Sequence, residues 1–268
     1  MDRITIVEGD CRALDPRAFA DADVMITDPP YSAHVHGNAV SQSRKRGVRS
    51  RDLGFEHLGR SLRRVVASAA SSVKRWSLVY SDVESSTWLR LAVQAQGGTY
   101  VRTLPWVRWS MPQLSGDRPT TGLEHVCLFH GTQTGAKRWN GPGSLVALTH
   151  LAMRGEGKHK AQKPLDQALD LVSWFSDPDE LVLDLFGGAG TTARACQILG
   201  RRCVSIELDP IWATRARERL AAGLSSEERV RVERFVAGPY EDEQGQPGPS
   251  AERAARRASD RERARGVL

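Results

Sequence analysis

Short apolar runs alternate along the chain with longer segments whose apolar residues recur every three or four positions. The short runs are rich in Val, Ile and Leu and predict strands, whereas the longer segments predict helices. Their alternation is typical of an α/β domain with a largely parallel sheet. The predicted strands cover residues 4–10, 24–27, 77–81, 100–106, 125–130, 181–186 and 203–208.

The predicted helices are bounded by residues that suit helix ends. Asp accepts hydrogen bonds from the first free N–H groups of a helix, Pro fits its first turn, and Gly favours its end. These signals predict helices over 58–73, from Asp82 to Gly97-Gly98, from Pro164 as first residue to Phe175, up to Gly200, and from Asp209-Pro210 onward.

Two stretches show no apolar periodicity. Residues 32–54 are rich in Gly, Ser, Arg and His, which predicts a long loop of a kind that often has a function. Residues 238–268 are low in bulky apolar side chains and balanced in charge, which predicts a disordered tail or a frayed helix. We therefore expect one folded domain over residues 1–237.

The composition excludes a membrane protein. Hydrophobic residues make up 40% of the 268 residues, and no run approaches the roughly 20 apolar residues that a membrane span needs. The first ten residues lack the pattern of an export signal, so we expect a cytoplasmic protein. The cysteines have no CxxC spacing, which predicts buried thiols rather than a metal site or a disulfide framework. They are Cys11, Cys127, Cys196 and Cys203.

The formal net charge of +6 is concentrated in one segment. Residues 41–75 contain ten Lys and Arg residues against two acidic ones, which is a local charge of +8. Such a run is either a solvated loop or a surface that faces the phosphates of a nucleic acid. The candidates for phosphate contact in its first part are Arg44, Lys45, Arg46, Arg49 and Arg51.

The first motif that suggests a functional site is Asp28-Pro29-Pro30-Tyr31, which directly follows a predicted strand. Two consecutive prolines end the strand in a rigid turn at its carboxyl end, where open α/β sheets bind ligands. A carboxylate and a backbone carbonyl in this turn suit the two hydrogens of an amino group on a nucleobase, and Tyr31 suits stacking on an extruded base. A simple turn remains the alternative interpretation.

The second motif spans Asp184 to Thr192 and contains Gly187, Gly188 and Gly190. Glycines between a strand and a helix let the backbone approach a ligand closely. Glu207 ends the next predicted strand, where an acidic side chain can bind ribose hydroxyls. The same glycines fit a dinucleotide-binding pattern, so a nicotinamide dehydrogenase is a rival interpretation at this point.

The third motif runs from His159 to Pro164 and leads into the helix before the Gly-rich strand. Its position places Gln162 and Lys163 near the same sheet edge, where a lysine can pair with a carboxylate. A plain polar loop with a helix-starting proline is the alternative.

Together the three motifs resemble a known family. Asp-Pro-Pro-Tyr, then H-x-x-Q-K-P, then Phe-Gly-Gly-Ala-Gly-Thr-Thr is the motif order of the circularly permuted, β-class amino-group DNA methyltransferases, which use S-adenosylmethionine (SAM). The stretch 113–119 with Glu124 behind it is similar to a phage- and prophage-associated subgroup. The resemblance covers about residues 4–220 and implies a Rossmann-like fold with a seven-stranded, mostly parallel sheet and one antiparallel strand. It also decides against the dehydrogenase.

The resemblance also implies roles for individual residues. Asp28, Pro29, Pro30 and Tyr31 would hold the target base, with no metal involved. A set of residues would bind SAM: Glu207 at the ribose, Asp10 with Cys11 at the adenine, Lys163 with Gln162 and Thr191 or Thr192 toward the methionine carboxylate, and Asp184, Phe186, Gly187, Gly188 and Gly190 along the pocket. Ala189 stands where family members often carry Ser.

The family implies site-specific methyl transfer to double-stranded DNA by a monomer or homodimer. Adenine N6 is the expected target because members with Asp at the first motif position usually modify adenine. Cytosine N4, an RNA amino group, and a catalytically inactive module that binds SAM and DNA remain alternatives.

Sequence recognition is expected in an insertion at about residues 105–160. This region holds aromatic and basic side chains able to stack on bases and reach their edges. The candidates are Trp106 and Trp109, for which core packing is equally plausible, and Arg118, Arg138 and Trp139.

Overall fold

The computed structural model describes residues 3–33, 57–108, 122–133, 135, 137–142, 147–151, 162–237 and 251–268. The strands are β1 (Ile4–Glu8), β2 (Val24–Thr27), β3 (Trp76–Ser81), β4 (Thr99–Val107), β5 (Leu123–His130), β6 (Leu181–Asp184) and β7 (Arg202–Glu207). The helices are η1 (Cys11–Ala13), η2 (Pro16–Asp21), α2 (Arg60–Ser72), α3 (Val83–Ala95), α4 (Leu165–Phe175), α5 (Thr191–Leu199), α6 (Pro210–Ala221), α7 (Ser226–Ala237) and α8 (Ala251–Arg265).

The seven strands form one sheet in the order β1-β7-β6-β2-β3-β5-β4. Strand β5 pairs antiparallel with both β3 and β4, and the remaining pairs are parallel. The structure therefore confirms the predicted strands, the fold class and the single antiparallel strand.

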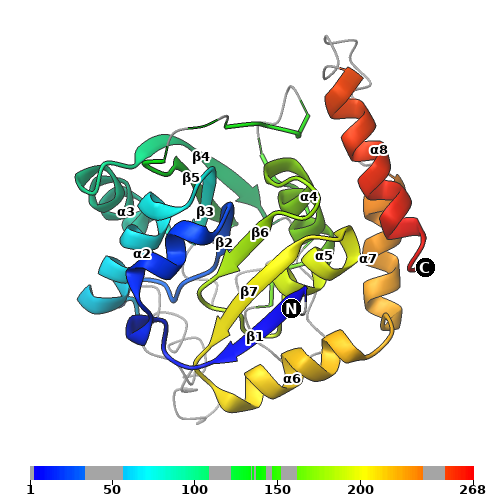
Figure 1. Cartoon of the computed structure of the whole chain (residues 1–268), viewed down its shortest axis with the longest axis horizontal. Helices are drawn as coiled ribbons and strands as arrows, with labels where there is room; N and C mark the ends of the chain where they lie inside the picture. The colour runs from blue at the N-terminus through cyan, green and yellow to red at the C-terminus, as the bar shows by residue number, and fades with distance from the viewer. Residues whose placement is uncertain are drawn as a thin grey trace, which may run out of the picture.

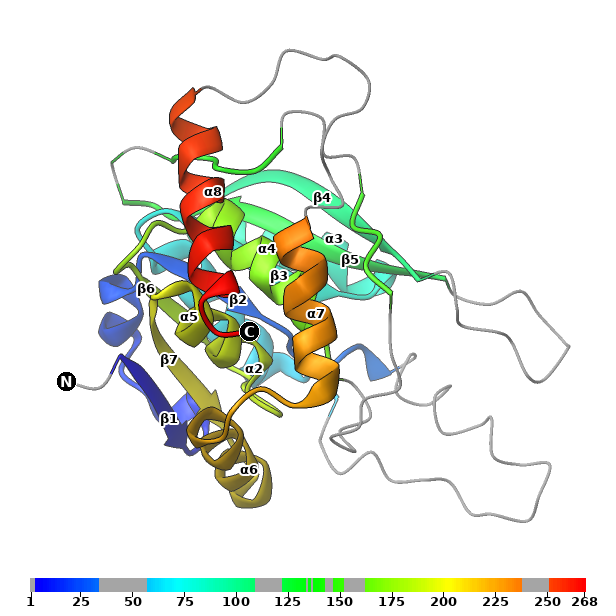
Figure 2. The same cartoon turned by 90° about the vertical axis from the view of Figure 1, so that its right-hand side faces the viewer.

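Helices cover both faces of the sheet. Side chains alternate between the faces along a strand, so Val24 and Ile26 pack in one apolar cluster with α4 and α5, whereas Met25 packs in the other with α2 and α3. Figure 1 shows α2 and α3 on one side of the sheet and α4 and α5 on the other. In Figure 2, α7 and α8 lie side by side as an outer layer over α4 and α5.

The predicted helix ends are confirmed with one shift. Asp82 accepts a hydrogen bond from the N–H of Ser85 at 2.5 Å, and Asp209 caps a helix whose first residue is Pro210. Gly200 ends α5 with a φ of 70°, a conformation that favours glycine. Pro164 is the N-cap of α4 rather than its first residue, so the predicted boundary is wrong by one position.

Of the two expectations for the tail, disorder is wrong for Ala251–Arg265, which form helix α8. This helix docks mainly through charge. Asp260 is buried and receives two hydrogen bonds from the equally buried guanidinium of Arg201, at 2.5 and 2.9 Å. The hydroxyl of Ser173 on α4 donates a third at 2.8 Å. Residues 238–250 lie outside the described residues.

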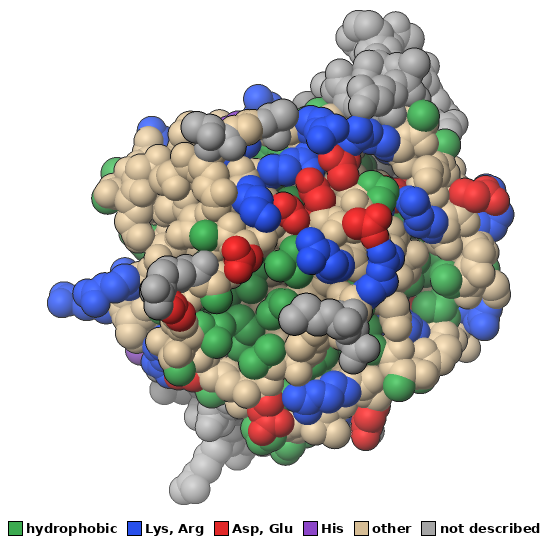
Figure 3. All heavy atoms as spheres, viewed as in Figure 1, with side chains coloured by type: hydrophobic (Ala, Val, Ile, Leu, Met, Phe, Trp, Pro, Cys, Tyr) green, Lys and Arg blue, Asp and Glu red, His purple; other side chains and the backbone are tan. Residues whose placement is uncertain are grey.

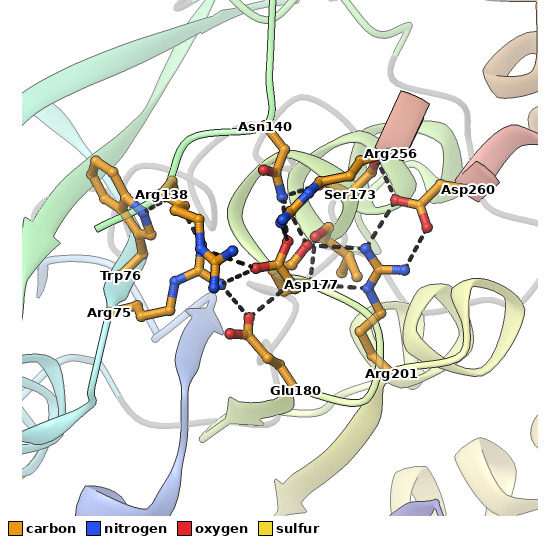
Figure 4. A network of polar contacts seen from close by, with 12 residues as sticks. Arg75, Trp76, Arg138, Asn140, Ser173, Asp177, Glu180, Arg201, Arg256 and Asp260 are labelled. Carbon is orange, nitrogen blue, oxygen red and sulfur yellow. Dashed lines mark hydrogen bonds and ion pairs between the residues drawn. The ribbon is translucent and has the colours of Figure 1, made fainter. Parts of the chain in front are cut away.

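A wider polar network surrounds this ion pair at the amino ends of the parallel strands. Asp177, which lies between α4 and β6, pairs with Arg75, Arg138 and Arg256 and accepts a hydrogen bond from Asn140 at 3.0 Å. Figure 4 shows these side chains converging from β3, from the loop after β5 and from α8. The network ties the C-terminal helix to the sheet.

The four cysteines are free and buried, as predicted. Among the helices of the described ranges, none has both the length and the apolar character of a membrane span.

Because Asp260 is buried and pairs with the equally buried guanidinium of Arg201, Asp260→Ala should lower the free energy of unfolding by about 3 kcal/mol. Chemical denaturation followed by circular dichroism measures this. The matched control is Glu262→Ala on the same helix, because the side chain of Glu262 is 73% exposed and pairs with the exposed Arg265. Equal stability of the two variants would contradict the docking of α8.

Candidate active site

The site lies where the strand order reverses. The chain leaves β6 toward β7 and leaves β2 toward β3, and β6 and β2 are neighbours in the sheet. Such a switch point opens a crevice at the carboxyl ends of the two strands. The hydroxyl of Thr27, the last residue of β2, donates to Asp184 at the end of β6 at 2.9 Å. The Asp-Pro-Pro-Tyr turn and the Gly-rich loop therefore begin side by side.

The Gly-rich loop is folded so that its backbone is accessible and its glycines are required. Gly188 and Gly190 have φ values of 50° and 74°, in the left-handed region. A Cβ on Gly190 would lie 3.0 Å from the Cβ of Ala216 on α6. A Cβ on Gly187 would lie 2.3 Å from the hydroxyl of Ser205. The loop thus packs closely against β7 and α6.

Asp184, the last residue of β6, is hydrogen-bonded to the start of this loop. Its carboxylate accepts hydrogen bonds from the N–H of Phe186, from Thr27 and from Thr192. Burial raises the pKa of Asp184 to about 6, although these hydrogen bonds act in the opposite direction. Asp184 therefore supports the loop.

Glu207 at the end of β7 is oriented by two backbone groups. It accepts hydrogen bonds from the N–H of Gly188 at 2.6 Å and from the N–H of Asp209 at 2.9 Å. The N–H of Gly9 donates to the carbonyl of Glu207 at 2.9 Å, which brings the segment after β1 alongside. A carboxylate fixed in this way at a strand end suits the hydroxyl groups of a ribose.

Asp10 and Cys11 lie next to this carboxylate in the fold. The Asp10 carboxylate binds the guanidinium of Arg12, with Nε at 2.9 Å and Nη2 at 2.6 Å, and the hydrogen bonds from Arg12 lower its pKa. Cys11 is buried in the core. The structure brings Asp10 to the predicted edge but gives its carboxylate an internal partner.

A cavity of about 500 Å³ adjoins the loop on the side of α6 and α7. It reaches from Gln162 and Lys163 past Ala189 to Trp212. Gln162 has a buried Oε1 without a hydrogen-bond partner in the described part of the chain. Thr191 accepts a hydrogen bond from Arg219 at 3.1 Å.

The base side of the site centres on Asp28. Burial raises its pKa, although the nearby ammonium of Lys163 lowers it. Lys163 lies 2.6 Å from Oδ2, whereas Oδ1 is buried and has no hydrogen-bond partner among the described residues. Pro29 is buried beside it and Tyr31 is half-buried. One carboxylate oxygen of Asp28 is thus without a donor among the described residues.

Glu124 and Arg108 complete the base side, and the sequence motifs assign a role to neither. The hydroxyl of Tyr31 donates to Glu124 Oε2 at 2.7 Å, and Glu124 pairs with both Lys163 and Arg108. Glu124 lies on β5, far in the chain from the motifs. The alternation of its strand predicts which face it occupies but not this partner.

Arg138 and Trp139, the predicted DNA contacts, lie away from the other site residues. Both lie at the amino ends of the strands, opposite Asp28, where Arg138 pairs with Asp177 (Figure 4). Trp139 packs on Trp174 and Phe175 with ring centroids 6.0 and 4.8 Å apart. The face in Figure 3 carries basic and acidic side chains intermixed rather than a patch of one sign.

The remaining basic and aromatic candidates divide into two groups. Of the +8 segment, Lys74 and Arg75 pair with acidic residues at the amino edge. Trp106 is buried in the core. The other candidates lie outside the described residues: Arg44, Lys45, Arg46, Arg49, Arg51, Trp109 and Arg118.

Comparisons with known proteins agree with this geometry. YubD of Escherichia coli (strain K12), whose name describes it as a methylase, is 37% identical over 222 residues, which cover 81% of this chain and 89% of that protein. The type II methyltransferase M.SmaI of Serratia marcescens is 33% identical over 154 residues, so the chain spans about half of that enzyme, 52%.

Solved structures show the same fold. M1.HpyAVI in complex with SAM has a TM-score of 0.62 and 21% identity, covering 82% of this chain and 100% of that one. The cytosine-N4-specific PvuII DNA methyltransferase has a TM-score of 0.58 and 16% identity, covering 86% and 90%.

A family model of N6 and N4 methyltransferases, described as DNA methylase, matches residues 137–216, which include the Gly-rich loop and Glu207. With the extended likeness to YubD, this match shows that the chain belongs to the DNA methylase family.

Proposed function

We propose that this protein transfers the methyl group of SAM to an exocyclic amino nitrogen of a base in double-stranded DNA. The observation that carries the proposal is the buried, unpartnered Oδ1 of Asp28 beside a Gly-rich loop at the switch point. The glycine backbone and the fixed Glu207 carboxylate suit SAM, which supplies a methyl group on an activated sulfonium.

The residues of this chain supply positioning and hydrogen-bond acceptors. Asp28 Oδ1 and the carbonyl of Pro29 accept the two amino hydrogens, which localises the lone pair on nitrogen. Tyr31 stacks on the extruded base. Because the acceptors are already oriented and desolvated, they stabilise charge as it develops on the amino group without reorganising. Asp28 is also the nearest group to take up the proton that the amino nitrogen loses.

Adenine N6 is the proposed target, since Asp occupies the first position of the motif, and cytosine N4 is the second candidate. The purified protein should be incubated with SAM and unmethylated DNA, and the digested nucleosides identified by mass spectrometry. We expect N6-methyladenine. N4-methylcytosine would change the assigned base, and modification of RNA alone, or of neither nucleic acid, would contradict the proposal.

Asp28→Ala should reduce methyl transfer by a factor of about 10²–10³, the usual loss when one preorganised group at the reacting centre is removed. The dissociation constant for SAM, measured by calorimetry, should stay unchanged because Asp28 lies on the base side. Asp28→Asn keeps the shape of the side chain and controls for misfolding. Full activity of either variant would contradict the role of Asp28.

We also propose that the basic segment after Tyr31 contacts DNA phosphates. Replacing its first five basic residues by Gln should flatten the dependence of log K on log salt by up to about 0.9 for each phosphate that is no longer neutralised. The residues are Arg44, Lys45, Arg46, Arg49 and Arg51. The control is Lys74→Gln with Arg138→Gln at the amino edge. An unchanged slope in the fivefold variant, or an equal change in the control, would contradict the assignment.

A further inference from the structure

The ammonium group of Lys163 is fully satisfied by the base side of the site. Its three N–H groups face three oxygens: Oδ2 of Asp28 at 2.6 Å, Oε2 of Glu124 at 3.1 Å and the hydroxyl of Tyr31 at 3.3 Å. The Lys163 side chain is 13% exposed. The two catalytic candidates Asp28 and Tyr31 are therefore joined through one cation.

Aromatic rings enclose the same cation. The Nζ of Lys163 lies 4.9 Å from the ring centroid of Tyr80, 5.4 Å from that of Tyr31 and 6.0 Å from that of Trp106. A cation in this position is attracted by the ring faces, most strongly where water is excluded. The rings and the oxygens together hold Lys163 in one place.

Glu124 connects this cation to the rest of the sheet. It accepts the hydrogen bond of the Tyr31 hydroxyl, pairs with Lys163 and pairs with Arg108 at the end of β4. Two carboxylates and two cations balance one another here. Such a buried set is stable only when each charge keeps its partner.

The arrangement leaves Asp28 with one oxygen held and one oxygen free. We propose that Lys163 and Glu124 are positioning residues for Asp28 and Tyr31, so that Lys163 serves base binding rather than the carboxylate of SAM. This inference rests on the proposed methyl transfer. By fixing Oδ2, Lys163 aims Oδ1 at the amino group, and by fixing the hydroxyl of Tyr31, Glu124 sets the plane of the stacking ring.

The two positioning residues act on Asp28 with opposite sign. Burial has the largest effect on the pKa of Asp28 and raises it. The charge of Lys163 lowers this pKa, and the charge of Glu124 raises it. The other titratable or charged groups on this side of the sheet in the described ranges are Tyr31, Tyr80, Asp184 and, through Glu124, Arg108. Ionised Asp28 accepts hydrogen bonds at both carboxylate oxygens and is the active form. Activity therefore falls as the pH drops through the pKa of Asp28.

Lys163→Met should therefore move the acid limb of the kcat profile to higher pH, and Glu124→Gln should move it to lower pH. Lys163→Met should lower kcat by about a hundredfold through loss of alignment. Lys163→Arg, which keeps the charge, should retain part of the activity. The dissociation constant of SAM, measured by calorimetry, should be the same for the wild type and all three variants.

A weaker SAM affinity of Lys163→Met with an unmoved acid limb would overturn the inference and assign Lys163 to the cofactor. A readout without activity separates this result from failure of the proposed function. In the empty wild-type protein, mass spectrometry should show amine-reactive labelling of Lys163 far slower than that of Lys74, whose side chain is 44% exposed. Glu124→Ala should speed labelling of Lys163 alone. Equal labelling rates for the two lysines would overturn the proposed positioning role of Lys163 even if DNA is methylated.

Discussion

The parallel pairing of β2 with β6 is the constraint on which the site depends. The two strands are neighbours although 157 residues separate Thr27 from Asp184, whose side chains join across the strand ends. From this pair the chain departs in opposite directions, so α5 and α2 cover opposite faces and neither closes the edge between them. The base-holding turn and the cofactor loop start within a residue or two of the shared hydrogen bond.

Charge pairing keeps the base side functional after it has been buried. An isolated carboxylate in a dry pocket would take up a proton and lose its strength as an acceptor. Glu124 stays ionised. Burial raises its pKa, but the charges of Lys163 and Arg108 outweigh that effect and hold the pKa below its usual value. Burial raises the pKa of Asp28, and the charge of Lys163, which is opposed by that of Glu124, does not bring it back to its usual value. The site therefore keeps Glu124 as a fixed anion and Asp28 as the group that can exchange a proton.

Local patterns in the sequence predict the strands, most helix ends and the order of the motifs because each depends on neighbouring residues. They do not predict pairings between distant residues. The position of Lys163 at the sheet edge predicts a carboxylate partner but not which one: the family resemblance implies the carboxylate of SAM, whereas the ammonium lies 2.6 Å from Oδ2 of Asp28. Helix α8 has too few bulky apolar residues for an apolar stripe, and it is held instead by Asp260 and Arg201, which composition cannot reveal. Trp139 has the loop-like surroundings of a contact residue, but its ring fills a gap beside Phe175.

Two aspartates at opposite edges of the sheet show what separates a structural carboxylate from a reactive one. Asp177 at the amino edge uses both oxygens: Oδ1 receives Asn140 and Arg256, and Oδ2 receives Arg75. Burial raises its pKa, but these donors hold it below the usual value, so it stays an inert anion. The Oδ1 of Asp28 is buried as well, yet it has no donor in the described part of the chain. A desolvated oxygen without a donor costs free energy in the folded state, and a ligand that donates a hydrogen bond recovers it. In the proposed function, this missing partner is what makes Asp28, and not Asp177, a binding group.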